Sequence, residues 1–279
     1  MASRIVLLAW FAALLILTFA PTLKDLVFEW IDNEDMGHGF FVPLVSGYII
    51  WLLRDQLKFP AKPCFAGLLL VLYAGFQYFA AVLGVELFLA RTAFVFCLTG
   101  MALYLAGWEN FKILRFPLFL LLFMVPLPAI IFSQITFPLQ IFASQVAEVT
   151  LGLLGIPVLR EGNILELPSQ RLSVVEACSG IRSLISLSFL SLVYGYFFDQ
   201  RPWMKWALWA LIIPIAVIAN AARVTTTGIL SEMNPELAKG FFHTAEGWII
   251  FAVAMVMLIG VHALLSLIIR RFSRPPAAS

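Results

Sequence analysis

Charged residues are scarce in this chain. Only 12% of its 279 residues are Asp, Glu, Lys or Arg, and 62% are hydrophobic. A typical soluble domain has about 25% charged residues. The net charge of +2 is too small to indicate binding to nucleic acid. The composition therefore excludes an ordinary soluble globular protein.

The sequence also lacks the patterns of several common sites. Its three cysteines give no disulfide framework, and its three scattered histidines have no spacing typical of a metal site. No glycine-rich loop of the phosphate-binding type is present. We therefore expect no cofactor and no metal.

Apolar runs of about 20 residues recur instead, which predicts an all-α polytopic membrane protein forming a single domain over residues 1–279. The first run has no cleavage site before Pro21 and is expected to be a retained span. Pro117, Pro126 and Pro128 are expected to kink the fifth span or end it early. The eight expected spans are Ile5–Ala20, Phe40–Leu53, Cys64–Leu83, Glu86–Ala106, Ile113–Phe132, Ser179–Phe198, Trp203–Ala222 and Gly247–Ile269.

Basic residues of the loops fall mostly on one side of this eight-span arrangement. By the positive-inside rule that side is the cytoplasm, so both termini are expected there. Lys24, Arg160, Arg171 and Lys239 are exceptions. The predicted cytoplasmic set comprises Arg4, Arg54, Lys58, Lys62, Lys112, Arg115, Arg201, Lys205, Arg270, Arg271 and Arg274.

The segment 134–154 does not fit the simple pattern. It is apolar but carries Gln140, Gln145 and Glu148, and a ninth span would put the termini on opposite sides. We expect an interfacial or re-entrant helix on the outer side, ended by Gly155 and Pro157. Residues 158–177 then predict a small extracytoplasmic β-meander, with turns at residues 161–163 and 168–170.

Cys178 follows this meander in the motif EACSGIR and begins the sixth span. Unpaired backbone N–H groups and the helix dipole at a helix start favour a thiolate. Most free cysteines, however, are small buried packing residues. Position alone leaves the two interpretations about equal.

Topology brings two more polar residues to the same outer rim. Arg223 closes the seventh span and His243 precedes the eighth. Each alone has a plain interpretation, an interface anchor or a loop histidine. Together they provide acyl-transfer chemistry, in which Cys178 attacks a carbonyl, His243 transfers the proton and Arg223 donates to the oxyanion.

Neighbouring polar residues are candidates for supporting roles. Arg182 either lowers the thiol pKa or anchors the helix end. Asn220 lies one turn before Arg223 and is expected to orient it, and Glu176 either holds a histidine tautomer or is simply solvated. His38 is a second candidate base on the outer face, and His262 is expected to be a packed or hydrogen-bonded core residue.

The motifs EACSGIR, NAAR and FHTAEGW resemble those of the exosortase/archaeosortase family of membrane cysteine transpeptidases. The flanking stretches HGFFVPLVSGYIIWLLRD, LFMVPLPA and GNILELP look like further family motifs, so the resemblance covers residues 38–248. It implies a bacterial inner-membrane enzyme with a periplasmic active site, and Cys178, Arg223 and His243 match the family's catalytic positions. The implied substrates are membrane-anchored proteins with C-terminal PEP-CTERM-type tails. These are cleaved and passed to an unknown acceptor or water, often beside exopolysaccharide genes.

Two other classes of function remain open at this point. A polysaccharide polymerase or flippase also has many spans and uses outward-facing arginine and histidine, and Cys178 would then only pack. A membrane scaffold without enzymatic activity would leave the thiol with ordinary reactivity.

Overall fold

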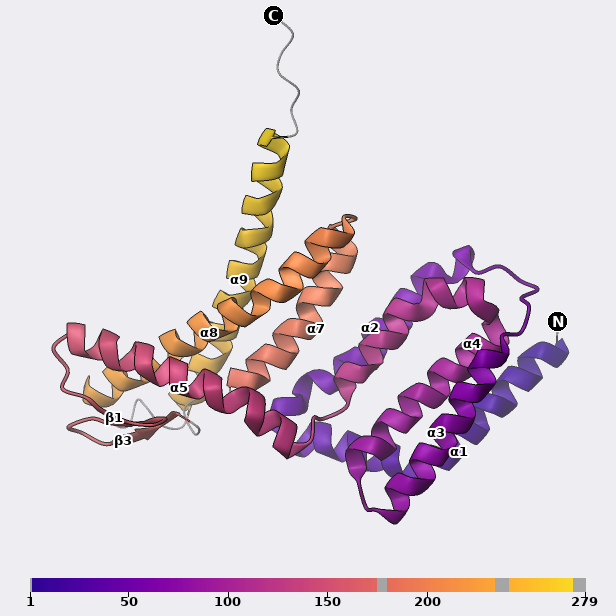
Figure 1. The fold of residues 1–279 in the computed structure, drawn as a ribbon, viewed down its shortest axis with the longest axis horizontal. Coiled ribbons are helices and arrows are strands. Elements are labelled where there is room, and N and C mark those ends of the chain that lie inside the picture. Colours follow the sequence, from indigo (N-terminus) through magenta and orange to yellow (C-terminus); the bar gives the residue numbers. More distant parts are fainter. Residues whose placement is uncertain (1, 175–179, 234–240, 273–279) are drawn as a thin grey trace, which may run out of the picture. The chain divides into compact units, whose positions relative to one another are not determined.

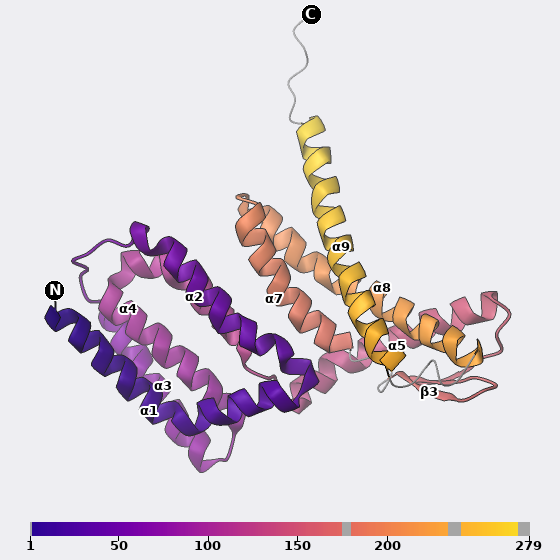
Figure 2. The same cartoon turned by 180° about the vertical axis from the view of Figure 1, so that it is seen from behind.

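The computed structural model describes residues 2–174, 180–233 and 241–272 (Figures 1 and 2). The chain divides into an N-terminal unit, Met1–Pro128, and a C-terminal unit, Ala129–Ser279. The prediction that residues 1–279 form one domain stays a prediction.

All described elements of the N-terminal unit are helices. Its elements are α1 (Ala2–Asp32), η1 (Glu34–Phe40), α2 (Phe41–Leu53), η2 (Arg54–Gln56), α3 (Phe65–Leu83), α4 (Leu87–Leu120) and η3 (Leu121–Met124). Helices α3 and α4 pack most extensively, through Gly67 and Gly100. A Cβ atom on Gly100 would lie 2.8 Å from the Gly67 carbonyl oxygen, so the two backbones approach closely. Small residues at such contacts are typical of helices packed in membranes.

Helix α4 reverses direction at Gly107, where φ is 73° and ψ is 171°. Near its start, Arg91 lies 3.6 Å from Glu29 of α1. Gly107 itself lies against the Lys62 backbone at the other end of the unit. After the break the chain returns to the end where Arg91 lies. This is shown by the Met124 carbonyl, which accepts a 2.9 Å hydrogen bond from Trp30, next to Glu29. The 34-residue element therefore crosses the N-terminal unit twice, as the fourth and fifth expected spans require.

The two ends of the N-terminal unit differ in charge. Asn110 of α4 hydrogen-bonds both the backbone N–H and the carbonyl of Lys58, at 2.8 and 2.9 Å. This contact brings the basic loop between α2 and α3 to the same end as Lys112 and Arg115. At the opposite end, Arg91 and acidic residues of α1 line an open cavity: Asp25, Phe28, Glu29, Asp32, Asn33, Leu87 and Arg91. The segregation of charge inferred from the sequence is thus present within this unit.

The C-terminal unit combines long helices with a small sheet. Its described elements are α5 (Ala129–Leu153), β1 (Leu159–Glu161), β2 (Ile164–Glu166), β3 (Arg171–Ser173), α7 (Gly180–Phe198), α8 (Pro202–Met233) and α9 (Phe241–Phe272). Helix α8 packs against α5, α7 and α9. The strands form an antiparallel meander in the order β1-β2-β3, as predicted. Gly162, with φ of 65°, allows the tight turn between β1 and β2.

Seven stretches of the described residues are long and apolar enough to cross a membrane, which agrees with a polytopic membrane protein. They are Trp10–Asp32, Met36–Gln56, Phe65–Leu83, Leu87–Met124, Ala129–Leu153, Pro202–Met233 and Ile249–Arg271. The described apolar part of α7, Leu184–Phe198, is shorter. Counting α4 as two passes and leaving α5 aside gives the eight expected spans.

Several expected boundaries are wrong. Helix α1 continues through Pro21 to Asp32, and α8 and α9 are longer than the apolar runs that predicted them. The fifth span does not reach Phe132. Its helix ends at Leu120 and η3 at Met124, before Pro126, and a new helix begins at Ala129. The proline run thus ends this span early, as expected, because proline lacks the N–H that an α-helix needs.

Helix α5 covers the segment predicted to be interfacial or re-entrant. It is one element of 25 residues that contains Pro138, and Gly155, with φ of 78°, follows its end. By length and composition it also qualifies as a span. Its interfacial or re-entrant position stays a prediction.

Candidate active site

The predicted catalytic residues differ in how much the structure describes of them. Arg223 is described in full on α8, and His243 lies in the first turn of α9, where the backbone is described. Arg182 lies in the first turn of α7, again as backbone. Cys178 and Glu176 lie outside the described residues.

Helices α7 and α8 form an antiparallel hairpin around a short turn, residues 199–201. Gly180 lies 18 residues before Phe198, and Asn220 lies 18 residues after Pro202 (198 − 180 and 220 − 202). Because both helices rise about 1.5 Å per residue, the start of α7 is level with Asn220 and Arg223. The hairpin therefore brings Arg223 to the end of the unit where the chain enters α7.

Arg223 and Asn220 are buried on α8, with 7% and 8% of their surfaces exposed. Their neighbours Ala221 and Val224 belong to a hydrophobic core shared with α5 and the sheet. An arginine that pointed into water would be mostly exposed. The plain interpretation of Arg223 as a snorkelling interface anchor therefore does not fit its burial.

The sheet directs the chain toward this part of α8. Leu165, Leu172 and Val174 lie in the same core as Ala221 and Val224, and Val174 is fully buried. Val174 also donates a 2.9 Å backbone hydrogen bond to the Asn163 carbonyl. The last residue described before the cysteine motif is thus fixed beside the Arg223 region.

Polar contacts fix the sheet to both neighbouring helices. The Ser169 hydroxyl donates a 2.6 Å hydrogen bond to Glu232 of α8 and lies 3.2 Å from the Ser231 hydroxyl. On the other side, Arg160 pairs with Glu148 of α5 at 2.8 Å. Reasoning from sequence assigned no role to Ser169 and Glu232, because a loop serine and a loop carboxylate are usually solvated.

Small residues on α8 allow α5 to approach the candidate site closely. Thr227 and Ser231 are buried, and a Cβ atom on Gly228 would lie 3.0 Å from Leu151 of α5. The Thr227 hydroxyl donates a 3.0 Å hydrogen bond to the Arg223 carbonyl, so its polar group is satisfied within the helix. The spacing of small residues in RVTTTGILS is the sequence signal that could have predicted the contact between α5 and α8.

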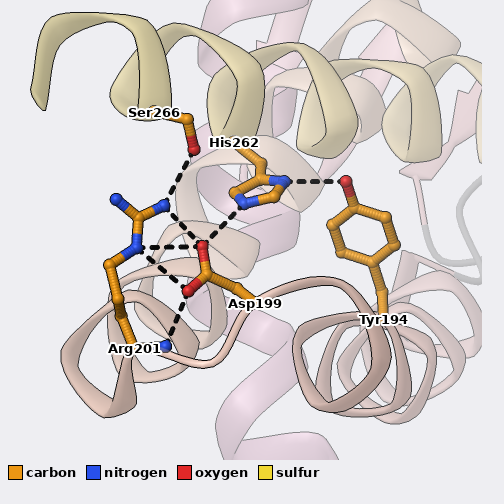
Figure 3. Close-up of polar contacts among 5 residues, drawn as sticks. All are labelled: Tyr194, Asp199, Arg201, His262 and Ser266. Atoms are coloured by element: carbon orange, nitrogen blue, oxygen red, sulfur yellow. Dashed lines mark hydrogen bonds and ion pairs between the residues drawn. The ribbon is translucent and has the colours of Figure 1, made fainter. Parts of the chain in front are cut away.

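A second polar cluster lies at the other end of the α7–α8 hairpin (Figure 3). Asp199 accepts hydrogen bonds from Arg201, and its Oδ2 lies 3.0 Å from Nε2 of His262 on α9. Nδ1 of His262 is 2.8 Å from the Tyr194 hydroxyl. The expected hydrogen-bonded core role of His262 is confirmed, whereas its partners could not be read from the sequence.

His38, the second candidate base, lies in the N-terminal unit. Its Nε2 lies 3.1 Å from the Phe123 carbonyl. Because a carbonyl only accepts, this nitrogen carries a hydrogen and ties η1 to η3. A catalytic role for His38 stays a prediction. Among the side chains that the structure describes, no group of three or more His, Cys, Asp or Glu is placed to hold a metal ion.

These helices define a multi-span membrane protein in which a small sheet and a buried arginine share one end of the C-terminal unit. Residues 30–260 match the family described as Transmembrane exosortase (Exosortase_EpsH). The chain therefore belongs to the transmembrane exosortase family. Searches of curated proteins and of solved structures found no match. Membership supports a general role as a membrane transpeptidase in protein sorting.

Proposed function

We propose that the protein is a cysteine transpeptidase or protease of the bacterial inner membrane. It cleaves PEP-CTERM-type tails of membrane-anchored proteins at the periplasmic face and transfers the acyl group to an acceptor or to water. Both termini lie in the cytoplasm in this proposal. The proposal joins family membership to the sequence motifs around Cys178, Arg223 and His243.

The reaction proceeds through a thioester. The Cys178 sulfur attacks the scissile carbonyl carbon while His243 takes the thiol proton, and collapse of the tetrahedral intermediate breaks the C–N bond. His243 returns that proton to the departing amine. An amine, hydroxyl or water nucleophile then attacks the thioester and releases the thiol.

Arg223 stabilises the oxyanion of both tetrahedral intermediates, with backbone N–H groups at the start of α7 as further donors. Burial strengthens this role, because a guanidinium removed from water interacts more strongly with a developing negative charge. Asn220 orients Arg223 from one turn away. Arg182 favours the thiolate, and Glu176 holds the histidine tautomer.

The single observation that carries the proposal is the burial of Arg223 at the level where α7 begins. Val174, just before the cysteine motif, shares a core with residues on both sides of Arg223. A short chain segment therefore joins the Arg223 region to the start of α7. The two outer strands, β1 and β3, also provide edges to which an extended peptide can add.

The test compares cysteine variants with a tailed substrate in reconstituted membranes. Cys178→Ala and Cys178→Ser should abolish cleavage, and the wild type should form a thioester adduct on Cys178 detectable by mass spectrometry. Cys64→Ala and Cys97→Ala are matched controls, since these two half-buried cysteines lie in the N-terminal unit. Normal processing by Cys178→Ala would refute the cysteine mechanism. In the polymerase or flippase alternative Cys178 only packs, so Cys178→Ala should leave the function of the protein intact.

A further inference from the structure

The polar cluster at the α7–α8 turn connects α7 and α9 through the turn that leads into α8 (Figure 3). Tyr194 comes from α7, Asp199 and Arg201 from the turn into α8, and His262 and Ser266 from α9. We propose that Asp199 and His262 are positioning residues for the reaction, because this cluster sets the depth and rotation of α9 and so of His243. The inference rests on the proposed function.

Asp199 is the centre of the cluster, and only 4% of its side chain is exposed. The Arg201 side chain donates hydrogen bonds to both carboxylate oxygens. Its Nε lies 3.0 Å from Oδ1, and its Nη2 lies 2.6 Å from Oδ2. The Arg201 backbone N–H adds a 2.7 Å bond to Oδ1. Paired and bidentate charges of this kind have a strongly preferred geometry, so the carboxylate is held in one orientation.

Helix α9 is attached to this centre at two points. His262 Nε2 lies 3.0 Å from Asp199 Oδ2, and Arg201 Nη2 donates a 3.0 Å hydrogen bond to the Ser266 hydroxyl. His262 and Ser266 are four residues apart and therefore share one helix face. The Tyr194 hydroxyl holds the other imidazole nitrogen at 2.8 Å. Two attachments on one face fix both the rotation of a helix and its position along its axis.

Few apolar residues of α9 are buried, although Ala254 and Leu258 lie in a core with residues of α7 and α8. Only 11% of its apolar stretch Ile249–Arg271 is buried, the smallest share among the seven candidate spans. In a membrane, lipid tails compete with apolar side chains for the same contacts, so specificity depends on close packing and on interhelical hydrogen bonds. A slip of one residue would move His243 by about 1.5 Å and rotate it by about 100°.

All three helices that carry the proposed catalytic residues meet at this cluster. The chain enters α7 just after Cys178, Arg223 lies on α8, and His243 lies in the first turn of α9, each toward the far end of its helix. Helix α9 runs without proline from Phe241 to Phe272. The 19 residues between His243 and His262 span about 28 Å, so the helix transmits the orientation fixed at one end to the other.

The first experiment measures helix position without reference to catalysis. Spin labels at Met233→Cys on α8 and Ile249→Cys on α9, both exposed positions, report the distance between these helices in a background without native cysteines. His262→Phe should broaden or shift the distance distribution, and Tyr194→Phe should do so to a lesser degree. Tyr196→Phe, two residues away on α7, is the matched control and should leave it unchanged. An unchanged distribution in folded His262→Phe overturns the proposal whatever the chemistry of the site.

The second experiment measures reactivity in the native-cysteine protein. Asp199→Asn and His262→Phe should lower kcat at least tenfold with KM changed less than twofold, because the substrate contacts remain while the base is misplaced. The pH profile of Cys178 alkylation should shift to higher pH. The loss of activity could instead be proportional to the loss of folded protein, with an unchanged pH profile of Cys178 alkylation. That result would show that the cluster only stabilises the fold, and it would overturn the positioning role. Normal processing by Cys178→Ser would instead refute the proposed function and leave the distance result standing.

Discussion

At the scale of single residues, burial distinguishes Arg223 from the other arginines of the C-terminal unit whose side chains the structure describes. Arg160 and Arg171 pair with carboxylates of α5 and of the sheet, and the Arg171 side chain is largely exposed. Arg223 lies instead inside the α8 face that joins two hydrophobic cores, between Ala221 and Val224 on one side and Ala219 on the other. Removing a guanidinium from water is costly, so such a position indicates a role beyond solubility.

Replacing Arg223 should therefore impair the reaction far more than replacing an exposed arginine. Arg223→Ala is expected to lower kcat by about 10²–10³, the usual effect of losing one oxyanion donor. Arg171→Gln is the control. Cleavage rates of a tailed substrate, with the folded fraction measured by gel filtration, check this. A loss smaller than about threefold for Arg223→Ala would contradict the assigned role.

The Asp199 carboxylate predicts a pH dependence of stability. The hydrogen bonds from Arg201 hold the pKa of Asp199 well below its ordinary value. The stabilisation is thus fully present above that ordinary value, near 3.9, and is lost only as the pH falls through the lowered pKa. Asp199→Asn should have a lower Tm than the wild type by an amount that is constant above about pH 5 and shrinks below about pH 4. Thermal unfolding in detergent at several pH values measures the difference.

The sequence predicted which single residues are important better than it predicted which residues they contact. The motif around Arg223 identified a polar residue at the end of an apolar run, but hydropathy alone does not distinguish a buried guanidinium from a snorkelling one. The core role of His262 was correct for a similar reason, since a histidine deep in an apolar run needs partners. Those partners, Asp199 and Tyr194, lie 63 and 68 residues away in the sequence, and no local pattern connects them.

At the scale of elements, local signals were sufficient where turns are tight. Gly162 and the Pro168–Gln170 turn predicted the meander, and the structure has both turns between the expected strands. Helix ends were less accurate. Helices α1 and α8 continue beyond their apolar runs, because a helix in contact with other helices can extend past the hydrophobic stretch that a hydropathy pattern detects.

The close crossing of α3 and α4 gives a stability prediction. A Cβ atom on Gly67 would lie 2.5 Å from the Gly100 carbonyl oxygen and would also collide with the Tyr104 backbone. Gly67→Ala should therefore destabilise the protein by about 1–3 kcal/mol through overpacking. Gly75 lies on the same helix with open space around it, so Gly75→Ala should be neutral or slightly stabilising. Thermal unfolding of both variants tests the crossing, and equal Tm values would contradict it.

At the scale of the whole molecule, the side of the membrane on which each loop lies follows from the number of passes. Helix α5 is the element that decides this, because it is long enough to cross and was predicted not to. Ile130 and Leu153 near its two ends are both exposed. If α5 lies on the outer surface or is re-entrant, single cysteines at both positions should react with a membrane-impermeant maleimide added to intact spheroplasts.

Lys62→Cys is the matched inner control for that labelling, because it lies in the basic loop between α2 and α3 and is exposed. It should react only after the membrane is permeabilised. Labelling of only one end of α5 from outside would make this helix a ninth pass and would place the termini on opposite sides.

The backbone conformation of Gly107 affects the path of the whole N-terminal unit. A straight helix of 34 residues would be about 51 Å long, whereas the hydrocarbon core of a bilayer is about 30 Å thick. Without the bend, the apolar residues at the end of this helix, 116–120, would leave the bilayer on the basic side and stand in water. With it, the chain turns back at Gly107 and brings Met124 to the side from which α4 started. The left-handed dihedral of a single glycine thus gives the chain one more pass, and it decides at which face of the N-terminal unit residues 121–128 lie.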